Sequence, residues 1–320
     1  MAIRVGIVSW NTAALLDRCL GALPAAIAGA DATITVVDNA SDDQSAEVAE
    51  KHTGVRVIRN PTNIGYARAM NQALAGDDAT VLIALNPDTE PPPGSLAALA
   101  QRLLEQPDVG LVVPRLVGSD GALQHSVYRF PSSRQIATIL LSPSFVLRRG
   151  LGTRWWAEGY APHDEATDID WAIGAVHVIR SAALDGEQPY DESSFMYVED
   201  LDLCWRLARR GWRRRLEPDI TVEHVGNAAG AQAWGAERTA QWLVRTYDWY
   251  ERVHGPGARR RWAALNSAIV VVHLLTLLPL ALAGSRSRRR RIDDLKRVLP
   301  VHLRAVVRGA AGAADYPRRP

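Results

Sequence analysis

Short runs of β-branched and aliphatic residues alternate with longer segments of helical periodicity through the first part of the chain. Each short run stops at a polar cluster or a proline, which is typical of buried strands. The longer segments carry apolar residues at helical spacing, which predicts amphipathic helices. This alternation predicts βαβ units and an α/β fold with a mostly parallel sheet. The predicted strands are residues 4–10, 33–37, 55–59, 81–85 and 109–113, and the predicted helices are residues 13–23, 45–52, 66–74 and 94–105.

The apolar run at residues 81–85 is followed directly by Asn86, Pro87 and Asp88. Pro87 cannot donate a hydrogen bond to a sheet, so the strand should end before it. Asp88 then lies at the carboxyl end of a central strand, where open α/β sheets bind ligands. A carboxylate there suits a divalent cation, and the cation suits a diphosphate. Taken alone, the same three residues also make a good turn with no further function.

Three predicted strands end in polar clusters, at residues 9–11, 38–42 and 86–88. The carboxyl ends of parallel strands lie at the same edge of a sheet, so these clusters should converge on one crevice. Residues 1–116 are therefore predicted to form a nucleotide-binding half of Rossmann type. No GxGxxG motif is present, so the sequence does not support dinucleotide binding.

The following part, residues 117–230, is expected to form an acceptor-binding half. Residues 118–167 are irregular, residues 170–180 return to a strand pattern, and residues 198–210 predict an amphipathic helix that ends at Gly211. Short strands are predicted at residues 213–216 and 221–225.

Two positions in the acceptor half carry candidate chemistry. Glu199 and Asp200 begin the predicted helix beside several aromatic residues, and a carboxylate in an apolar pocket can act as a general base. The helix dipole alone would also favour acidic residues there. His224 stands at a strand end before Gly226, where it could share a cation with Asp88, although a single histidine is more often structural.

Residues 231–320 form a C-terminal region of different character. Its apolar segment, residues 263–284, is flanked by arginine clusters. The unbroken apolar core of this segment, residues 268–283, is 16 residues long and is shorter than the ~20 apolar residues that a membrane-spanning helix needs. Cations on both sides favour a re-entrant or interfacial segment, and a buried core helix is the alternative. The arginines at residues 286–291 would be attracted to anionic lipid headgroups.

The net charge of +2 gives no reason to expect a nucleic-acid partner. Cys19 and Cys204 fit no metal motif, and we interpret them as reduced core thiols of a cytoplasmic protein. The chain enters a strand at once and shows no signal peptide, so we expect the catalytic part at the inner face of the cell membrane. An oligomer is compatible with the sequence.

Seven motifs together resemble family 2 glycosyltransferases of the GT-A fold, in the branch that contains rhamnosyltransferases and galactofuranosyltransferases. The resemblance covers roughly residues 3–230 and keeps the family's order of motifs. The motifs are residues 7–11, 37–42, 63–67 with Asn71, 85–89, 171–175, 199–206 and His224.

The resemblance implies a Rossmann-like, mixed and mostly parallel sheet flanked by helices in residues 1–230, followed by a helical, membrane-associating appendage. It implies that Asp200 is the catalytic base and that Asp88 with His224 holds Mg²⁺ or Mn²⁺. Asn86 replaces the first acidic residue of the family's metal motif, so fewer acidic ligands remain and His224 becomes more important as the second metal ligand. The donor-binding residues that it implies are Ser9, Asp38, Asn39, Gly65, Arg68, Asn71 and Asn86, and the acceptor-side residues are Trp171 and Glu199.

The activity implied is inverting transfer of a sugar, for which we expect L-rhamnose, from a dTDP- or UDP-sugar to a polyprenyl-linked glycan of the cell wall or surface. One alternative is galactofuranosyl or N-acetylhexosaminyl transfer to a soluble acceptor. Another is a non-catalytic, membrane-surface sugar-nucleotide-binding protein, which would have lost Asp88, Asp200 or His224. A nucleotidyltransferase would need a glycine-rich basic loop after the first strand, and residues 9–12 contain neither glycine nor a cation.

Overall fold

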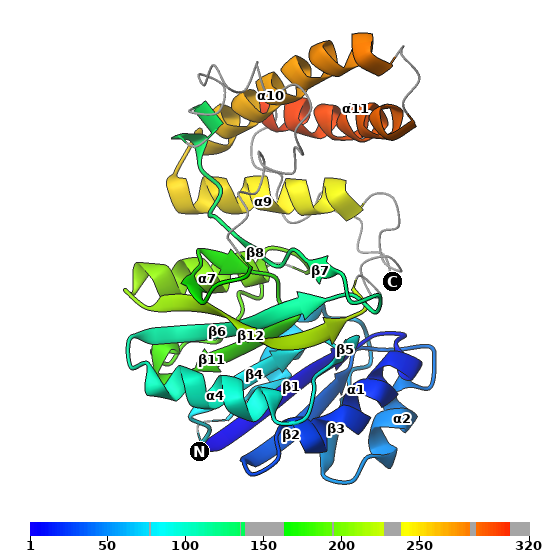
Figure 1. The fold of residues 1–320 in the computed structure, drawn as a ribbon, viewed down its shortest axis with the longest axis vertical. Coiled ribbons are helices and arrows are strands. Elements are labelled where there is room, and N and C mark those ends of the chain that lie inside the picture. The colour runs from blue at the N-terminus through cyan, green and yellow to red at the C-terminus, as the bar shows by residue number, and fades with distance from the viewer. Residues whose placement is uncertain are drawn as a thin grey trace. The chain divides into compact units, whose positions relative to one another are not determined.

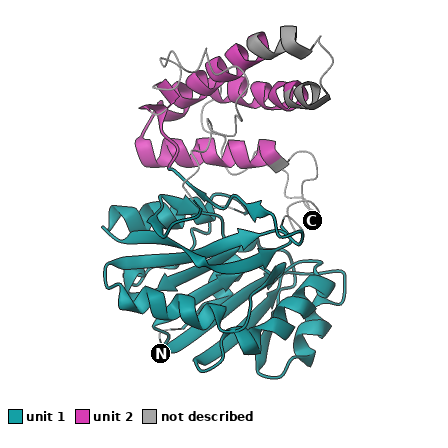
Figure 2. Cartoon of the chain, viewed as in Figure 1, with its two compact units in different colours: residues 1–129, 160–233, 320 teal, residues 130–159, 234–319 magenta. Residues whose placement is uncertain are grey.

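The protein forms two compact units in a computed structural model (Figure 2). The first comprises residues 1–129 and 160–233, and the second comprises residues 130–159 and 234–319. The second unit thus includes a segment that the sequence analysis assigns to the acceptor half. The structure describes residues 1–76, 78–134, 136–137, 163–193, 195–226, 238–281 and 286–307, without the side chains of residues 238, 276–281 and 286–291.

The first unit is built on a mixed sheet of order β3-β2-β1-β4-β11-β6-β12-β5, with β7 paired to β6 and β9 paired to β12 (Figure 1). The strands β8 and β10 pair separately. The strands are β1 (Ala2–Ser9), β2 (Asp31–Asp38), β3 (Val55–Arg59), β4 (Val81–Leu85), β5 (Thr89–Glu90), β6 (Val109–Val117), β7 (Leu123–Gln124), β8 (Val127–Tyr128), β9 (Thr167–Asp168), β10 (Trp171–Ala172), β11 (Val176–Arg180) and β12 (Arg213–His224). The helices are α1 (Ala13–Ala26), α2 (Ser45–Lys51), α3 (Tyr66–Ala73), α4 (Ser95–Glu105), the 3₁₀ turn η1 (Ser181–Leu184) and α7 (Glu199–Arg209).

The strands β3, β2, β1 and β4 are parallel, as the sequence predicts. Ser9 lies opposite Asp38, and Ile7 lies opposite Leu85, so the polar residues that follow these strands meet at one edge of the sheet. The predicted convergence of these polar clusters at one edge of the sheet is confirmed. The strand β4 ends at Leu85, directly before Asn86 and Pro87, also as predicted.

The second half of the sheet differs from the prediction in two places. Residues 170–180 form two strands in different sheets, and β11 inserts antiparallel between β4 and β6. Residues 213–216 and 221–225, predicted as separate strands, fall in the single strand β12 except for Val225, which follows its end; β12 shifts register between Glu217 and Thr221. An irregular step in one strand interrupts the apolar alternation and therefore looks like a loop in the sequence.

Helices cover both faces of the sheet in the first unit (Figure 1). The side chains of β1 that point to one face pack with α1 and α4 into a continuous apolar core, which includes Ile3, Val5 and Ile7. Gly6 points to the other face, where a β-carbon would lie 2.9 Å from the β-carbon of Ala73 on α3. The absent side chain thus allows α3 to approach the sheet closely.

The second unit contains three long helices, α9 (Arg238–His254), α10 (Ala258–Ala281) and α11 (Arg286–Val307). Its core is aromatic: the ring of Trp262 lies 4.8 Å from that of Tyr247 and 4.6 Å from that of Tyr250. The hydroxyl of Tyr247 hydrogen-bonds to Nδ1 of the buried His302 at 2.6 Å.

The predicted apolar segment of residues 263–284 falls mostly within α10, and its last three residues lie outside the described residues. Among the described helices, none combines the length and the apolar character needed to cross a bilayer. The helix is only partly buried: Ile269 and Val270 lie in the core, whereas Val271 is 41% and Leu275 is 65% exposed.

Candidate active site

Asp88 and His224 lie side by side, although 136 positions separate them in the chain. The short strand β5, which follows Asp88, pairs antiparallel with the end of β12, so that His224 lies opposite Thr89. The amide of Val225 also donates a hydrogen bond to the carbonyl of Asp88 at 2.9 Å. These backbone contacts bring Nε2 of His224 to 3.3 Å from Oδ1 of Asp88, and both side chains are buried.

This pair fits a divalent cation. Nε2 of His224 is buried and makes no hydrogen bond, so a nitrogen and a carboxylate oxygen face each other at 3.3 Å. Two neighbouring ligands of an octahedral ion, each about 2.1 Å from the metal, are separated by about 3.0 Å. The described residues contain no cluster of three or more metal-ligating groups. A Mg²⁺-like ion bound by one or two protein ligands is normally completed by water and substrate phosphates.

The turn that carries Asp88 is held from both sides. The amide of Asn86 donates to the carbonyl of Ala175 at 2.9 Å, and the hydroxyl of Thr89 donates to the carbonyl of Asn86 at 2.7 Å. The Cys19 thiol packs against the same turn, and burial raises its pKa to about 12. Cys19 and Cys204 are both free and buried, as the sequence predicts.

Asp200 lies in the first turn of α7 and keeps partial access to solvent. Its Oδ1 accepts a hydrogen bond from the amide of Leu201 at 2.8 Å, and its Oδ2 accepts one from the amide of Gly174 at 3.3 Å. Desolvation nevertheless dominates and raises the pKa of Asp200 to about 6. A carboxylate that is ionised at neutral pH but has an elevated pKa is suited to accept a proton from a hydroxyl group.

Glu199, the neighbour of Asp200, is buried, and its Oε2 makes no hydrogen bond. Burial first, and the charge of Asp200 second, raise the pKa of Glu199 to about 8, so this side chain is protonated at neutral pH. The backbone before it adopts positive φ angles without glycine, 71° at Tyr197 and 79° at Val198. Such a conformation is costly for a β-branched residue and occurs mainly where a site requires it.

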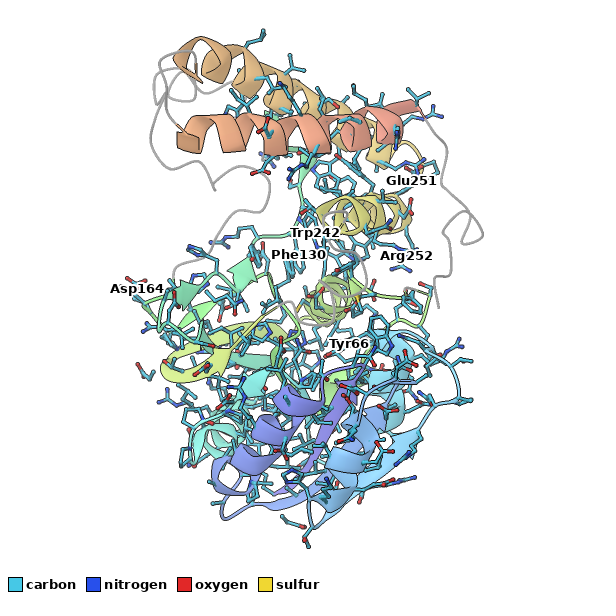
Figure 3. The ribbon with its side chains drawn as sticks, turned by 90° about the vertical axis from the view of Figure 1, so that its right-hand side faces the viewer. Tyr66, Phe130, Asp164, Trp242, Glu251 and Arg252 are labelled. Atoms are coloured by element: carbon cyan, nitrogen blue, oxygen red, sulfur yellow. The ribbon has the colours of Figure 1, made fainter. Side chains whose placement is uncertain are left out.

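The structure adds Tyr66, to which the sequence analysis gives no role (Figure 3). Its hydroxyl lies 3.4 Å from Oδ1 of Asn86 and 3.4 Å from the carbonyl of Gly174, so it joins the Asp88 turn to the loop beside Asp200. Burial, followed by the charges of Glu199, Asp200 and Asp88, raises the pKa of Tyr66 well above its usual range. Tyr66 therefore remains a neutral hydrogen-bond donor between the two carboxylate regions.

Three predicted donor-binding residues lie at the ends of β1 and β2. Asp38 is buried; its Oδ2 accepts from the amide of Ser41 at 3.3 Å, whereas its Oδ1 makes no hydrogen bond. Ser9 hydrogen-bonds to the hydroxyl of Thr12 at 2.7 Å. The Asn39 side chain is fully used within the protein, with hydrogen bonds to Asn60, Asn63, Ile64 and Gly65. Of these three side chains, Asp38 alone offers a buried acceptor without a hydrogen bond.

Three other predicted donor-binding residues contact the segment that precedes α7. Gly65 has a φ of 88°, and a β-carbon on it would lie 2.5 Å from the carbonyl oxygen of Phe195. The Asn71 side chain bonds to the backbone of Tyr190 at 2.8 and 3.1 Å. Arg68 pairs with Glu192 at 3.1 Å on the surface. In this structure the three residues hold Tyr190, Glu192 and Phe195 beside α3.

The predicted acceptor-side residue Trp171 is a packing residue in this structure. It is 3% exposed, stacks on Tyr128 at 4.7 Å, and donates its indole N–H to the carbonyl of Arg129 at 3.1 Å. The side chain to which the resemblance gives an acceptor-side role is therefore buried within the β8–β10 pair. Glu199, the other predicted acceptor-side residue, does lie next to Asp200.

The elevated pKa of Asp200 leads to a prediction for the pH dependence of the reaction. As the pH falls through about 6, Asp200 takes up a proton and can no longer act as a base, so we expect kcat to fall about tenfold per pH unit below that value. Because Glu199 is already neutral at pH 6, Glu199→Gln should leave the midpoint of this acidic limb in place. Rate measurements from pH 4.5 to 8 on both proteins test this, and a downward shift of the midpoint in the variant would show that Glu199 carries a charge there.

The parallel half-sheet, with Asp38 at the end of β2, Asp88 after β4 and Asp200 at the start of α7, is the arrangement that the resemblance to sugar transferases of GT-A fold predicts. Residues 4–154 match the family described as Glycosyl transferase family 2. The chain therefore carries a family 2 glycosyltransferase domain, and the protein is a glycosyltransferase. This confirms the resemblance on which the site residues were predicted.

Two curated relatives come from Mycobacterium tuberculosis. An N-acetylglucosaminyl-diphospho-decaprenol L-rhamnosyltransferase is 27% identical over 308 residues, which cover 89% of this chain and 95% of that protein. A pre-mycofactocin glycosyltransferase is 28% identical over 264 residues, which cover 80% of this chain and 52% of that protein. Among solved structures, a mannosyltransferase from Pyrobaculum calidifontis in complex with GDP-Man and Mn²⁺ shares the fold, with a TM-score of 0.56 and 17% identity over 95% of this chain and 84% of that one.

Proposed function

We propose that the protein transfers L-rhamnose from a nucleoside diphosphate, with inversion, to a polyprenyl-diphosphate-linked glycan used in cell-wall or surface polysaccharide synthesis. The observation that carries the choice of sugar and acceptor is the similarity to the decaprenol-linked rhamnosyltransferase, which extends over 89% of this chain and 95% of the relative. Alignment over nearly the full length includes the second unit as well as the glycosyltransferase domain.

In the proposed reaction, the acceptor hydroxyl attacks the anomeric carbon while the bond from that carbon to the diphosphate oxygen breaks. Asp200 takes the proton of the attacking hydroxyl, and a single displacement gives inversion. Asp88 and His224 would hold a divalent cation, which when bound neutralises the charge of the departing diphosphate. Tyr66 keeps the two regions in register through its contacts to Asn86 and Gly174.

We place the donor nucleotide at the edge formed by β1, β2 and β4. The buried Oδ1 of Asp38, which makes no hydrogen bond, fits the imide N–H of a uracil or thymine base. Ser9 and Asn39 would shape this part of the site through the loops they hold, and Asn86 would lie nearest the diphosphate. Gly65, Arg68 and Asn71 would line the donor side through their contacts with Tyr190, Glu192 and Phe195, and Trp171 would support the acceptor side from within the core.

Donor binding measured by calorimetry tests the proposal. In the presence of Mn²⁺, we expect dTDP-L-rhamnose to bind more tightly than UDP-galactofuranose or UDP-N-acetylglucosamine, and we expect transfer to a synthetic N-acetylglucosaminyl-diphospho-polyprenol. Tight binding of either UDP-sugar would instead favour galactofuranosyl or N-acetylhexosaminyl transfer. Transfer to a soluble acceptor alone would contradict the lipid-linked acceptor. Donor binding without transfer to any acceptor would favour a non-catalytic binding protein.

A lipid-linked acceptor calls for contact with the membrane, and we place this contact on the second unit. Residues 238–307 carry fourteen Lys and Arg residues against four Asp and Glu residues, whereas the whole chain has a net charge of only +2. Exposed apolar residues of α10 recur at helical spacing and form one stripe, which consists of Ala264, Ala268, Val271 and Leu275. The exposed Arg260 and Arg261 precede this stripe in the helix. An apolar stripe within a basic unit suits the surface of a bilayer that contains anionic lipid.

Vesicle sedimentation checks this placement. We expect the full chain to bind vesicles that contain phosphatidylglycerol, and to bind them several-fold less tightly in 0.5 M than in 0.1 M salt. Leu275→Asp should weaken binding about tenfold, because it places a charge on the apolar stripe. Leu104→Asp, at another exposed leucine in the first unit, is the matched control. Equal vesicle binding by both variants would show that the stripe does not contribute to membrane binding.

A further inference from the structure

Gln124 reaches the predicted metal ligand His224 from a part of the chain that contains none of the seven motifs. It lies on β7, a strand of two residues that pairs with the end of β6, where Gln124 is opposite Leu116. Its side-chain oxygen Oε1 is 2.7 Å from Nδ1 of His224, and the two residues are 100 positions apart in the sequence. The structure thus joins the irregular region after β6 to the centre of the site.

This hydrogen bond determines which nitrogen of His224 carries the proton. An amide oxygen can only accept, so Nδ1 must be the donor, and in the neutral ring Nε2 is left with its lone pair. That nitrogen lies 3.3 Å from Oδ1 of Asp88 and makes no hydrogen bond. The lone pairs of His224 and Asp88 therefore face the same point, as two ligands of one cation must.

We propose that Gln124 is a positioning residue for the metal ligand His224, holding its imidazole in the Nδ1–H tautomer with Nε2 directed toward Asp88. This inference rests on the metal role assigned to Asp88 and His224 under the proposed function. Ligating histidines generally need such an outer partner, and its loss typically lowers metal affinity 10- to 100-fold. Gln124 itself would not touch the cation.

The absence of a side chain at Gly226 leaves room for the amide of Gln124. Gly226, two residues after His224, has a φ of 80°, and a β-carbon on it would lie 2.9 Å from Nε2 of Gln124. On the other side, the turn between β6 and β7 is closed by hydrogen bonds of Gly118 with Ala122 and with Gly121, at 2.9 and 2.8 Å. The glycine after His224 is thus explained by the close approach of the amide.

Two substitutions at this position distinguish the effect of the hydrogen bond on metal binding from the effect of the size of the side chain. Gln124→Leu keeps the approximate size and removes the acceptor, whereas Gln124→Glu keeps an acceptor oxygen. With the full chain and saturating dTDP or UDP, binding of Mn²⁺ can be followed from the electron paramagnetic resonance signal of the free ion, without turnover. We expect Gln124→Leu to bind Mn²⁺ 10- to 100-fold more weakly and Gln124→Glu to bind it within about threefold of the unchanged protein. Gln101→Leu, at an exposed glutamine of α4, is the control for the substitution itself.

A second measurement reports the tautomer directly. In protein labelled with ¹⁵N-histidine and freed of metal, the His224 signals, assigned by their loss in His224→Asn, should show a protonated Nδ1 and an unprotonated Nε2. In Gln124→Leu the proton should move in part to Nε2. An unprotonated Nδ1 in the unchanged protein would overturn the proposal.

The results also separate this proposal from the proposed metal role. Equal Mn²⁺ binding by the unchanged protein and Gln124→Leu, with loss of binding in Asp88→Ala, would overturn the role of Gln124 alone. Failure of the unchanged protein to bind Mn²⁺ in the presence of either diphosphate would overturn both.

Discussion

Asp200→Asn is expected to lower kcat by about 10³-fold while leaving binding of the nucleotide-sugar donor nearly unchanged. Asparagine has almost the same shape and can still accept from the amides of Leu201 and Gly174, but it cannot take the proton of the acceptor hydroxyl. General-base catalysis typically contributes 10²- to 10⁴-fold, and the neighbouring carboxyl of Glu199, whose pKa burial raises to about 8, is protonated at neutral pH and cannot replace Asp200 as a base. Single-turnover transfer rates and donor calorimetry on the same preparation measure the two effects separately.

A control for this prediction is available on the same helix. Asp202 is also buried in the first turns of α7, but its carboxylate forms an ion pair with Arg206 at 2.9 Å. Asp202→Asn should therefore lower the thermal stability and leave the transfer rate per folded molecule close to normal. If Asp200→Asn lost donor binding along with transfer while keeping its fold, Asp200 would belong to the donor site and the assignment as base would be wrong.

Asp88→Ala is expected to weaken donor binding in the presence of Mn²⁺ by about 100-fold, which corresponds to about 2.7 kcal/mol. The substitution removes the carboxylate that faces Nε2 of His224, so the proposed cation loses one of its two protein ligands. Calorimetry with Mn²⁺ and with a chelator measures the affinity for the donor under the two conditions. The wild-type protein should bind the donor much more tightly with Mn²⁺ than with the chelator, and this difference should disappear in Asp88→Ala.

Glu90 provides the matched control for Asp88. It lies two residues further on, in β5, and its carboxylate pairs with Arg18 at 3.0 Å rather than with His224. Glu90→Ala should keep the dependence of donor binding on Mn²⁺. An Asp88→Ala protein that still bound the donor more tightly with Mn²⁺ than with chelator would mean that the metal ligands lie elsewhere.

The sequence by itself determined the parallel half of the fold and one edge of the site. β-Branched runs that stop at polar clusters specify buried strands, and helices between them specify parallel neighbours, so Ser9, Asp38 and Asp88 had to emerge at the same edge. Pro87 fixed the end of β4, and Gly211, with a φ of 83°, fixed the end of α7. These features depend on local rules, because a strand period, a proline or a glycine acts within a few residues.

The tertiary structure alone decided how the two halves meet. Nothing local requires β11 to insert antiparallel between β4 and β6, or β5 to pair with β12 so that His224 reaches Asp88. The same holds for Gln124, which meets His224 across 100 residues, and for Tyr66, whose hydroxyl reaches Gly174. Trp171 shows the converse, because an aromatic side chain in a strand has the same sequence signature whether it packs in the core or lines a site. The pairing of strands that are distant in sequence, and the burial of a particular side chain, depend on how all strands and side chains pack together. This global packing leaves no periodic pattern in the sequence from which it could be predicted.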